Sequence, residues 1–260
     1  MGTPEYLCGT QHIYKDKLIR KLLENNRDIL LNGDYNNAIS YDGIVDEGEY
    51  SHQNFRLVFL LKEPNGNKSD GSIPGYYEDW DYVNWIKEYQ STGVENIYPA
   101  LRNIAMWTSE FYDIFEHGKT DKALYLTNGT LQITDDLRNS LRKIAVINLK
   151  KTFGGGSTKW KDLNAYLNQD ICDILREEIC IAEPTWVLCG GQQVFDFVYR
   201  IHRAEISPPL TLSTANGYTV EYIPAYNYIY VNFRHPACRI SREKAFDYAA
   251  DVFEALRHLK

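Results

Sequence analysis

Short apolar runs alternate with amphipathic segments along this chain. Four of the runs, 55–61, 144–149, 185–189 and 228–233, have the length of a strand and carry almost no charge. Nearly continuous apolar runs of this length are typical of strands that are buried on both faces of a parallel sheet. A fifth and more polar segment, 218–223, is predicted to be an edge strand.

Amphipathic segments separate these runs. In 13–31, Ile19, Leu22 and Leu23 are among the apolar residues that recur at helical spacing, which predicts a helix. Polar and glycine residues predict irregular structure in 32–54, 65–75 and 152–158. Further helices are predicted over 80–90, 96–115, 135–143, 160–181, 192–200 and 241–259.

The alternation of strands and helices predicts an α/β fold. We expect a three-layer α/β/α sandwich around a central, mostly parallel sheet of four to five strands. A chain of 260 residues fits one large domain of this kind. Within it we expect 1–54 to be an N-terminal helical extension and 55–260 to be the core.

Cysteine usage and hydropathy exclude several classes of protein. The five cysteines are odd in number and include no C-x-x-C pair. This argues against a disulfide framework, a zinc ribbon and a four-cysteine iron–sulfur cluster, so we expect neither metal nor cofactor. The N-terminus is polar, and no apolar run approaches the roughly 18 residues of a membrane span. We therefore expect a cytoplasmic monomer that has no signal peptide and no membrane contact.

The formal net charge of −7 provides no overall field that would attract nucleic acid. A role on nucleic acid would therefore need a local basic patch. Basic residues do gather near the ends of predicted strands, on loops that we expect at one rim. They are Lys150, Lys151, Lys159, Lys161, Arg234, Arg239, Arg242 and Lys244.

Chemically useful side chains follow three of the predicted strands. Glu63 comes just after the first apolar run, Asn148 lies at the end of the second, and His235 follows the last. Ligands of open α/β folds bind at the carboxyl ends of the strands, where such residues meet. A carboxylate, an amide and an imidazole are thus expected in one site.

Four blocks in this order resemble the uracil-DNA glycosylase superfamily, over about 55–259 of the chain. In that family the first strand ends in Gly-Gln-Asp-Pro or Gly-x-Asn-Pro; here the loop reads Lys-Glu-Pro, with Glu63 before the proline. Asn148 matches the asparagine that reads the flipped base in the family. Gly190 and Gly191 match a Gly-Ser or Gly-Gly at a helix start, and 235–239 (His-Pro-Ala-Cys-Arg) matches His-Pro-Ser-x-(Leu or Arg).

The resemblance implies a metal-free DNA glycosylase and gives each of these residues a role. Glu63 would serve the attacking water and the sugar cation, and His235 would donate to O2 of the leaving base. Asn148 offers a donor and an acceptor to the Watson–Crick edge of the extruded base. Gly190 and Gly191 would cradle a phosphate with their backbone N–H groups. Further residues are expected to contact DNA or the base: Arg239 as a wedge, Lys150 and Lys151 on the backbone, and Tyr76 or Tyr77 as a stacking ring.

The sequence departs from the family at the position that shapes the base pocket. Asn65 stands where uracil-specific members carry a tyrosine that packs against C5 and excludes 5-substituted pyrimidines. An open wall there favours a 5-modified pyrimidine, such as a hydroxymethylated or glucosylated cytosine of bacteriophage DNA, over plain uracil. That substrate would make the protein an antiviral defence enzyme rather than a repair enzyme.

Simpler interpretations stay open at this point. Glu63 can be a solvated loop charge, His235 a helix cap or a buried histidine, and Asn148 a turn cap. The two glycines can serve tight packing, and the aromatic residues of 76–89 can belong to the core. A non-catalytic DNA-binding or sensor protein on the same fold, and a small-molecule hydrolase on a flavodoxin-like sheet, are the functional alternatives.

Overall fold

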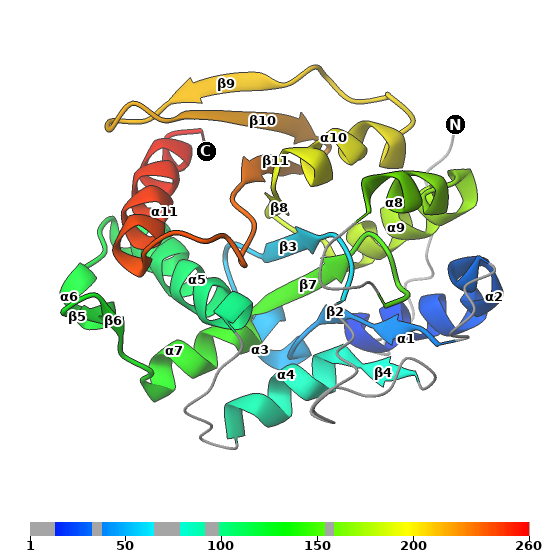
Figure 1. Ribbon diagram of the computed structural model, residues 1–260, viewed down its shortest axis with the longest axis horizontal. Helices are drawn as coiled ribbons and strands as arrows, with labels where there is room; N and C mark the ends of the chain where they lie inside the picture. The colour runs from blue at the N-terminus through cyan, green and yellow to red at the C-terminus, as the bar shows by residue number, and fades with distance from the viewer. Residues whose placement is uncertain (1–13, 33–37, 65–78, 92–98, 154–158, 260) are drawn as a thin grey trace.

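A mixed sheet runs through the centre of the protein in a computed structural model that describes residues 14–32, 38–64, 79–91, 99–153 and 159–259 (Figure 1). Within these residues seven strands form the sheet, in the order β2-β7-β3-β8-β11-β10-β9. The four central strands, β7, β3, β8 and β11, are parallel, and the outer strands are antiparallel to their neighbours. The strands are β2 (Gly43–Ile44), β3 (Leu57–Leu61), β7 (Ile144–Asn148), β8 (Trp186–Gly190), β9 (Leu210–Ser213), β10 (Thr219–Ala225) and β11 (Tyr228–Phe233).

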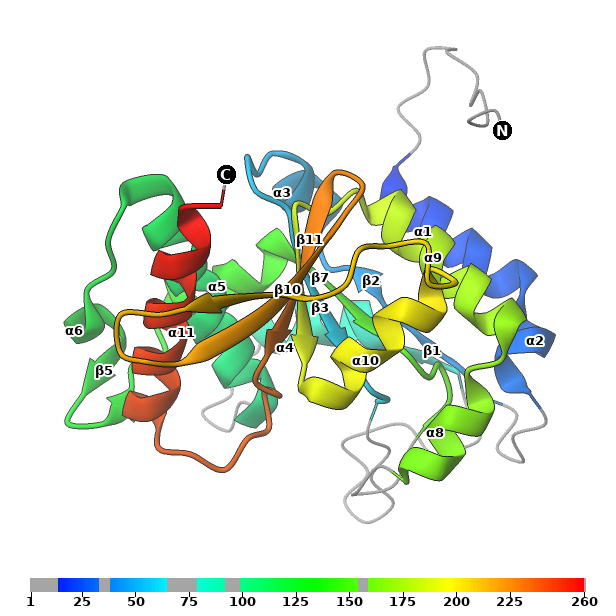
Figure 2. The same cartoon turned by 90° about the horizontal axis from the view of Figure 1, so that it is seen from above.

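Helices pack on both faces of the sheet (Figure 2). One face carries α1 (Lys15–Asn25), α2 (Arg27–Leu31), α8 (Trp160–Tyr166), α9 (Gln169–Ala182) and α10 (Gln192–Ile201). The other face carries α5 (Pro99–His117), α7 (Asp135–Ser140), η1 (Leu141–Lys143) and α11 (Arg242–Arg257). The remaining elements are α3 (Glu47–Ser51), α4 (Tyr82–Ser91), α6 (Lys122–Tyr125) and two short strand pairs, β1 (Ser40–Tyr41) with β4 (Trp80–Asp81) and β5 (Leu126–Thr127) with β6 (Thr130–Leu131).

The apolar runs form central strands because both of their faces are covered. In β3, Val58 and Leu60 pack toward α1 and α9, whereas Leu57, Phe59 and Leu61 pack toward α5 and α11. All five side chains are buried. The prediction of an α/β fold with a central, mostly parallel sheet and flanking helices is therefore confirmed. No helix among the described residues combines the length and apolar character that crossing a bilayer requires.

The sheet is wider than the four to five strands expected from the sequence. The segment predicted as an edge strand is β10, which pairs with β11 on one side and with β9 on the other. β9 is the edge; it has four residues, in which Leu210 and Leu212 alternate with polar residues, and its side chains are largely exposed. At the opposite edge β2 contributes only two residues, too few for a pattern to show.

The described residues before 55, which are 14–32 and 38–54, contain strands as well as helices and pack against the central sheet. The segment 32–54, expected to be irregular, contains β1, β2 and α3. β2 pairs with β7, and α1 packs its Ile19 and Leu23 into the core beside α9. The N-terminal segment thereby covers one edge and one face of the central sheet.

The helix predicted over 160–181 is two helices. α8 ends at Tyr166, and Asn168 caps α9 by accepting a hydrogen bond from the Ile171 N–H at 3.0 Å. Asparagine is a preferred N-cap because its side chain replaces the missing helical acceptor. The break directs α8 away from α9 toward the carboxyl edge of the sheet (Figure 2).

Candidate active site

The four chemical blocks lie side by side at the carboxyl edge of the sheet. Leu61 of β3 pairs with Asn148 of β7, and Phe233 of β11 pairs with Gly190 of β8. The ladder between β3 and β7 continues past the strands, since the Lys150 N–H donates to the Lys62 carbonyl at 2.8 Å. This pairing holds the loop that carries Glu63 against the segment that follows Asn148.

Glu63, Asn148 and His235 line one cavity of about 60 Å³. At roughly 10–15 Å³ for each water, this volume corresponds to about four to six water molecules. The cavity is therefore on the scale of a single planar ring. Its other walls are Leu61, Pro64, Trp80, Tyr82, Trp85, Ala100 and Ala237.

Aromatic side chains that the sequence analysis left with the core form one wall of this cavity. Trp80 is 5% exposed and lies edge-on to Tyr82, with ring centroids 4.9 Å apart. Tyr82 and Trp85 are stacked at 5.7 Å with 20° between their planes. In the sequence, the signal for this placement is the position of these aromatic residues just after the loop that follows Glu63. Besides Asn148, three residues were predicted to contact the base, Asn65, Tyr76 and Tyr77, and all three lie outside the described residues.

His235 is held as a neutral hydrogen-bond donor. Its Nδ1 accepts the Ala237 N–H at 3.1 Å, so the ring proton is on Nε2. Burial, together with the nearby Lys62 ammonium, lowers the pKa of His235 to about 4. The imidazole therefore stays uncharged near neutral pH and can still donate through Nε2.

Lys62, which precedes Glu63, extends toward α8. Its Nζ lies 5.4 Å from the centre of the Trp160 ring, in a cation–π contact. Burial lowers the pKa of Lys62, and the Glu63 carboxylate opposes that change. The ammonium thus lies between the catalytic candidates and the aromatic surface of α8.

Asn148 is hydrogen-bonded to a buried ionic network. Its backbone N–H and its side-chain Nδ2 both donate to Asp42 Oδ2, at 2.7 and 2.8 Å. The other oxygen of Asp42 accepts from Lys151 Nζ at 2.5 Å, and Lys151 also contacts Glu178 at 2.7 Å. The charged side chains of Asp42, Lys151 and Glu178 are fully buried.

This network corrects the prediction for Lys151, which was expected to contact DNA at the rim. The lysine points inward because two carboxylates receive it, and a charged residue type gives no sign of that in the sequence. Burial alone would lower the pKa of Lys151, but Asp42 and Glu178 outweigh it and raise that pKa. Burial raises the pKa of Glu178, against the opposing effect of Lys151.

Gly190 and Gly191 serve packing and a turn. A Cβ on Gly190 would lie 2.9 Å from Leu61 Cδ2 and 3.3 Å from His235 Cδ2, so glycine allows these strands' ends to approach. Gly191 has φ +102°, and its N–H donates to the Phe233 carbonyl at 2.7 Å. The N–H of Gly191 is thus engaged within the protein, which corrects its prediction as part of a phosphate cradle.

The remaining basic residues lie after β7, at the start of α8, in the loop that follows β11 and in the first turn of α11. Arg239 is exposed in that loop, and Lys150 is partly exposed. Arg234 lies over the Tyr248 ring at 4.4 Å. Asn103 of α5 ties the loop in place by donating to the Pro236 carbonyl at 2.6 Å. Lys159, Lys161 and Lys244 are exposed and Arg242 is partly buried.

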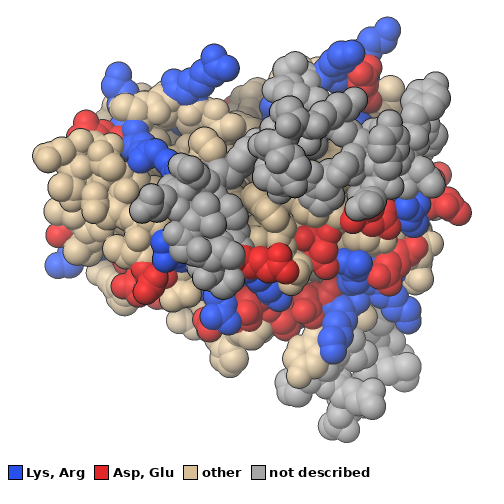
Figure 3. Space-filling model, turned by 60° about the horizontal axis from the view of Figure 1, so that its bottom comes forward, with Lys and Arg blue, Asp and Glu red and all other residues tan. Residues whose placement is uncertain are grey.

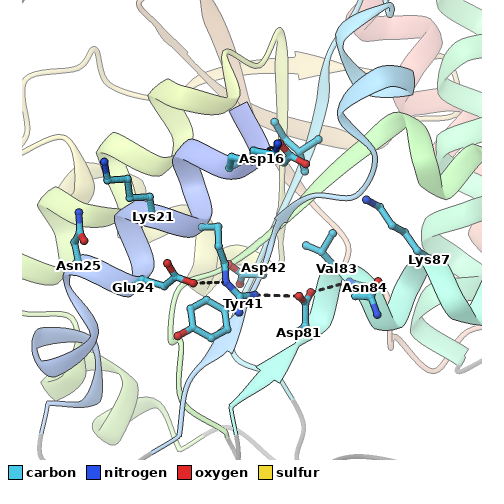
Figure 4. A pocket seen from close by; sticks show the side chains of 13 residues that line it. Asp16, Lys21, Glu24, Asn25, Tyr41, Asp42, Asp81, Val83, Asn84 and Lys87 are labelled. Carbon is cyan, nitrogen blue, oxygen red and sulfur yellow. Dashed lines mark hydrogen bonds and ion pairs between the residues drawn. The ribbon is translucent and has the colours of Figure 1, made fainter. Parts of the chain in front are cut away.

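A larger groove of about 620 Å³ lies outside this site, between α1 and α4 (Figure 4). Arg20 crosses it, pairing with Glu24 at 2.8 Å and Asp81 at 3.0 Å while its guanidinium lies 3.5 Å from the Tyr41 ring centre. On this face of the molecule acidic and basic side chains are interleaved (Figure 3). The groove's charges neutralise one another, so it offers no net attraction for an ion.

Comparison with known proteins identifies no family for this chain, so a proposal about its function rests on the geometry of the site. No protein-family model matches this chain, and none of the curated proteins matches it. Among the described residues, no group of three or more histidine, cysteine or acidic side chains is arranged to hold a metal ion.

Proposed function

We propose that this protein is a DNA glycosylase of the uracil-DNA glycosylase superfamily, on a three-layer α/β/α sandwich. It would hydrolyse the N-glycosidic bond of a flipped-out pyrimidine and leave an abasic site. One observation carries the proposal: Glu63, Asn148 and His235 come from three different strand ends and line one ring-sized cavity. Aromatic rings on the wall of that cavity provide surfaces on which a base can stack.

Glu63 would act on the sugar side of the reaction. As the bond from C1′ to the base nitrogen breaks, its electron pair leaves with the base and the sugar becomes an oxocarbenium-like cation. The Glu63 carboxylate stabilises this cation and accepts a proton from the water whose oxygen then bonds to C1′. Among the three residues it is the one whose charge fits that role.

His235 would act on the leaving base. The departing pyrimidine carries its negative charge largely on O2, and the Nε2–H of a neutral imidazole can donate to that oxygen. A neutral donor needs no proton transfer to stabilise the anion. Asn148 would hold the base at its Watson–Crick edge through its amide.

The cavity is on the scale of one pyrimidine ring, at about 60 Å³. Residues 65–78, which follow the Glu63 loop, lie outside the described residues, so the room beside C5 of the base is left to experiment. We retain 5-modified pyrimidines of phage DNA as the favoured class, with uracil as the alternative. Arg239 would fill the gap left by the flipped base, and Lys150 would contact the DNA backbone, inside the cytoplasm.

Base release from defined oligonucleotides tests this function. The protein is incubated with DNA that carries uracil, 5-hydroxymethyluracil, 5-hydroxymethylcytosine or its glucosylated form, then treated with alkali, and released bases are identified by mass spectrometry. We expect strand breaks after alkali and a free base from at least one substrate. His235→Ala should slow release by roughly 10²–10³-fold, whereas His258→Ala, at an exposed histidine at the end of α11, should not change it.

Two outcomes would favour the alternatives. Gel shifts without base release from any substrate would indicate a non-catalytic DNA-binding protein. Neither binding nor release would indicate a hydrolase that acts on small molecules. Arg239→Ala separates the wedge from general binding, since it should weaken activity on duplex DNA more than on single strands.

A further inference from the structure

Asp42 has a defined relation to the base-reading residue. It precedes β2, is 4% exposed, and accepts hydrogen bonds from both nitrogens of Asn148 through one oxygen. Its second oxygen accepts from the buried Lys151 ammonium. A carboxylate bonded to an ammonium only accepts hydrogen bonds. Asn148 must therefore turn its NH₂ group, and not its carbonyl, toward Asp42.

We propose that Asp42 is a positioning residue that fixes the Asn148 amide in one orientation and so determines which pyrimidine edge the cavity accepts. This inference rests on the proposed glycosylase function. A flipped amide would place Oδ1 where Nδ2 now lies, 2.8 Å from a carboxylate oxygen. Two acceptors at that distance in a buried site repel each other, and Nδ2 would lose its charged partner.

The strand order identifies the favoured edge. β2 lies on one side of β7, whereas β3, β8 and β11 follow on the other side (Figure 1). Asp42 directly precedes β2, Asn148 ends β7 and His235 follows β11, so Asp42 and His235 lie on opposite sides of Asn148 along the sheet. Nδ2 is then directed toward the β2 side, and Oδ1 lies nearer to His235. A base whose O2 faces His235 has N3 next to O2 and its 4-substituent farther toward β2.

In that pose Oδ1 of Asn148 meets N3, and the second N–H of Nδ2 meets the 4-substituent. A 4-keto pyrimidine supplies the matching N3–H donor and O4 acceptor. A 4-amino pyrimidine supplies an acceptor at N3 and a donor at position 4, which opposes both groups. The site should therefore release uracil and its 5-substituted forms and reject the corresponding cytosines.

Asp42→Asn tests this role while preserving the shape of the side chain. Its amide oxygen should face Lys151, which leaves an NH₂ group toward Asn148. That group can accept neither the Asn148 backbone N–H nor Nδ2, so the orientation of the Asn148 amide is no longer fixed. We expect wild type to prefer 5-hydroxymethyluracil over 5-hydroxymethylcytosine by roughly 10- to 100-fold in kcat/KM, the scale of one bidentate base contact. Asp42→Asn should reduce that ratio at least tenfold, whereas Asp247→Asn, at an exposed carboxylate of α11 paired with Lys122, should preserve it.

The side-chain amide of Asn148 gives a readout that needs no catalysis. Its two N–H resonances, assigned by their loss in Asn148→Ala, should be exchange-protected in wild type and lose protection in Asp42→Asn. Unprotected wild-type resonances, or a wild-type preference for the 4-amino base, would overturn the proposal even if Asp42→Asn failed to fold. Absence of any base release by wild type would instead overturn the proposed function, and the amide resonances would still decide the role of Asp42.

Discussion

Replacing Lys151 with methionine tests the buried network, because methionine keeps the aliphatic stem and removes only the ammonium. Lys151 is fully buried, 2.5 Å from Asp42 and 2.7 Å from Glu178. Removing one partner of a buried ion pair leaves an uncompensated charge and costs about 3–5 kcal/mol of unfolding free energy. For a chain of this size that corresponds to a fall in Tm of roughly 10 °C.

Urea and thermal unfolding at pH 7 measure this change, with Lys161→Met as the matched control. Lys161 is exposed on α8, so its substitution should change stability by no more than about 0.5 kcal/mol. Adding Glu178→Gln to Lys151→Met should change stability little further, since burial already raises the pKa of Glu178 to about 8 and loss of the Lys151 ammonium leaves a neutral acid at pH 7. A loss below about 1 kcal/mol for Lys151→Met, the range of an exposed ion pair, would refute the burial of Lys151.

Three further substitutions test the cavity and its walls. Glu63→Gln should slow single-turnover base release by roughly 10²–10⁴-fold and leave DNA affinity unchanged in gel shifts. Glu177→Gln, on the exposed side of α9, is the control. Near-normal release by Glu63→Gln would exclude a catalytic role for Glu63. His235 has a folded pKa of about 4, below the unfolded value of about 6.5, so the unfolded state binds more protons and stability falls as pH drops from 6.5 toward 4, by about 1 kcal/mol per unit. Urea unfolding of His235→Asn should show a shallower slope in that range, and an unchanged slope would contradict the assignment. Gly190→Ala should lower the free energy of unfolding by about 1–3 kcal/mol, because its Cβ would lie 2.9 Å from Leu61 Cδ2. Thermal unfolding measures this change, with Gly48→Ala as the control. Equal stability of the two variants would contradict the close approach of Leu61 to Gly190.

The convergence of Glu63, Asn148 and His235 could be predicted because it follows from topology. Residues just past parallel strands meet at one edge of the sheet, and the apolar runs that form those strands are evident in the sequence. The two glycines could not be assigned in the same way. Whether a glycine after a strand binds a ligand or permits a close approach depends on what packs against it.

The support beneath Asn148 could not be predicted from the sequence. Asp42 and Lys151 are 109 positions apart, and hydrophobic patterning treats both as surface residues. Lys150 and Lys151 are adjacent and chemically alike, yet only Lys151 is buried. The aromatic wall could not be predicted for a related reason. Trp80 is buried in the core, Tyr82 packs against it, and both also line the cavity.

The distance along the chain between Asp42 and Asn148 has a consequence for synthesis. The two residues are 106 positions apart, and the sheet edge that holds Asp42 consists of β2, whose partner in the sheet is β7. At roughly 5–20 residues per second, the ribosome adds the intervening chain in about 5–20 s. Throughout that interval the emerging N-terminal segment lacks both its strand partner and the α9 helix against which α1 packs. The apolar side chains of this N-terminal segment therefore remain accessible to chaperones until the second half of the protein has emerged.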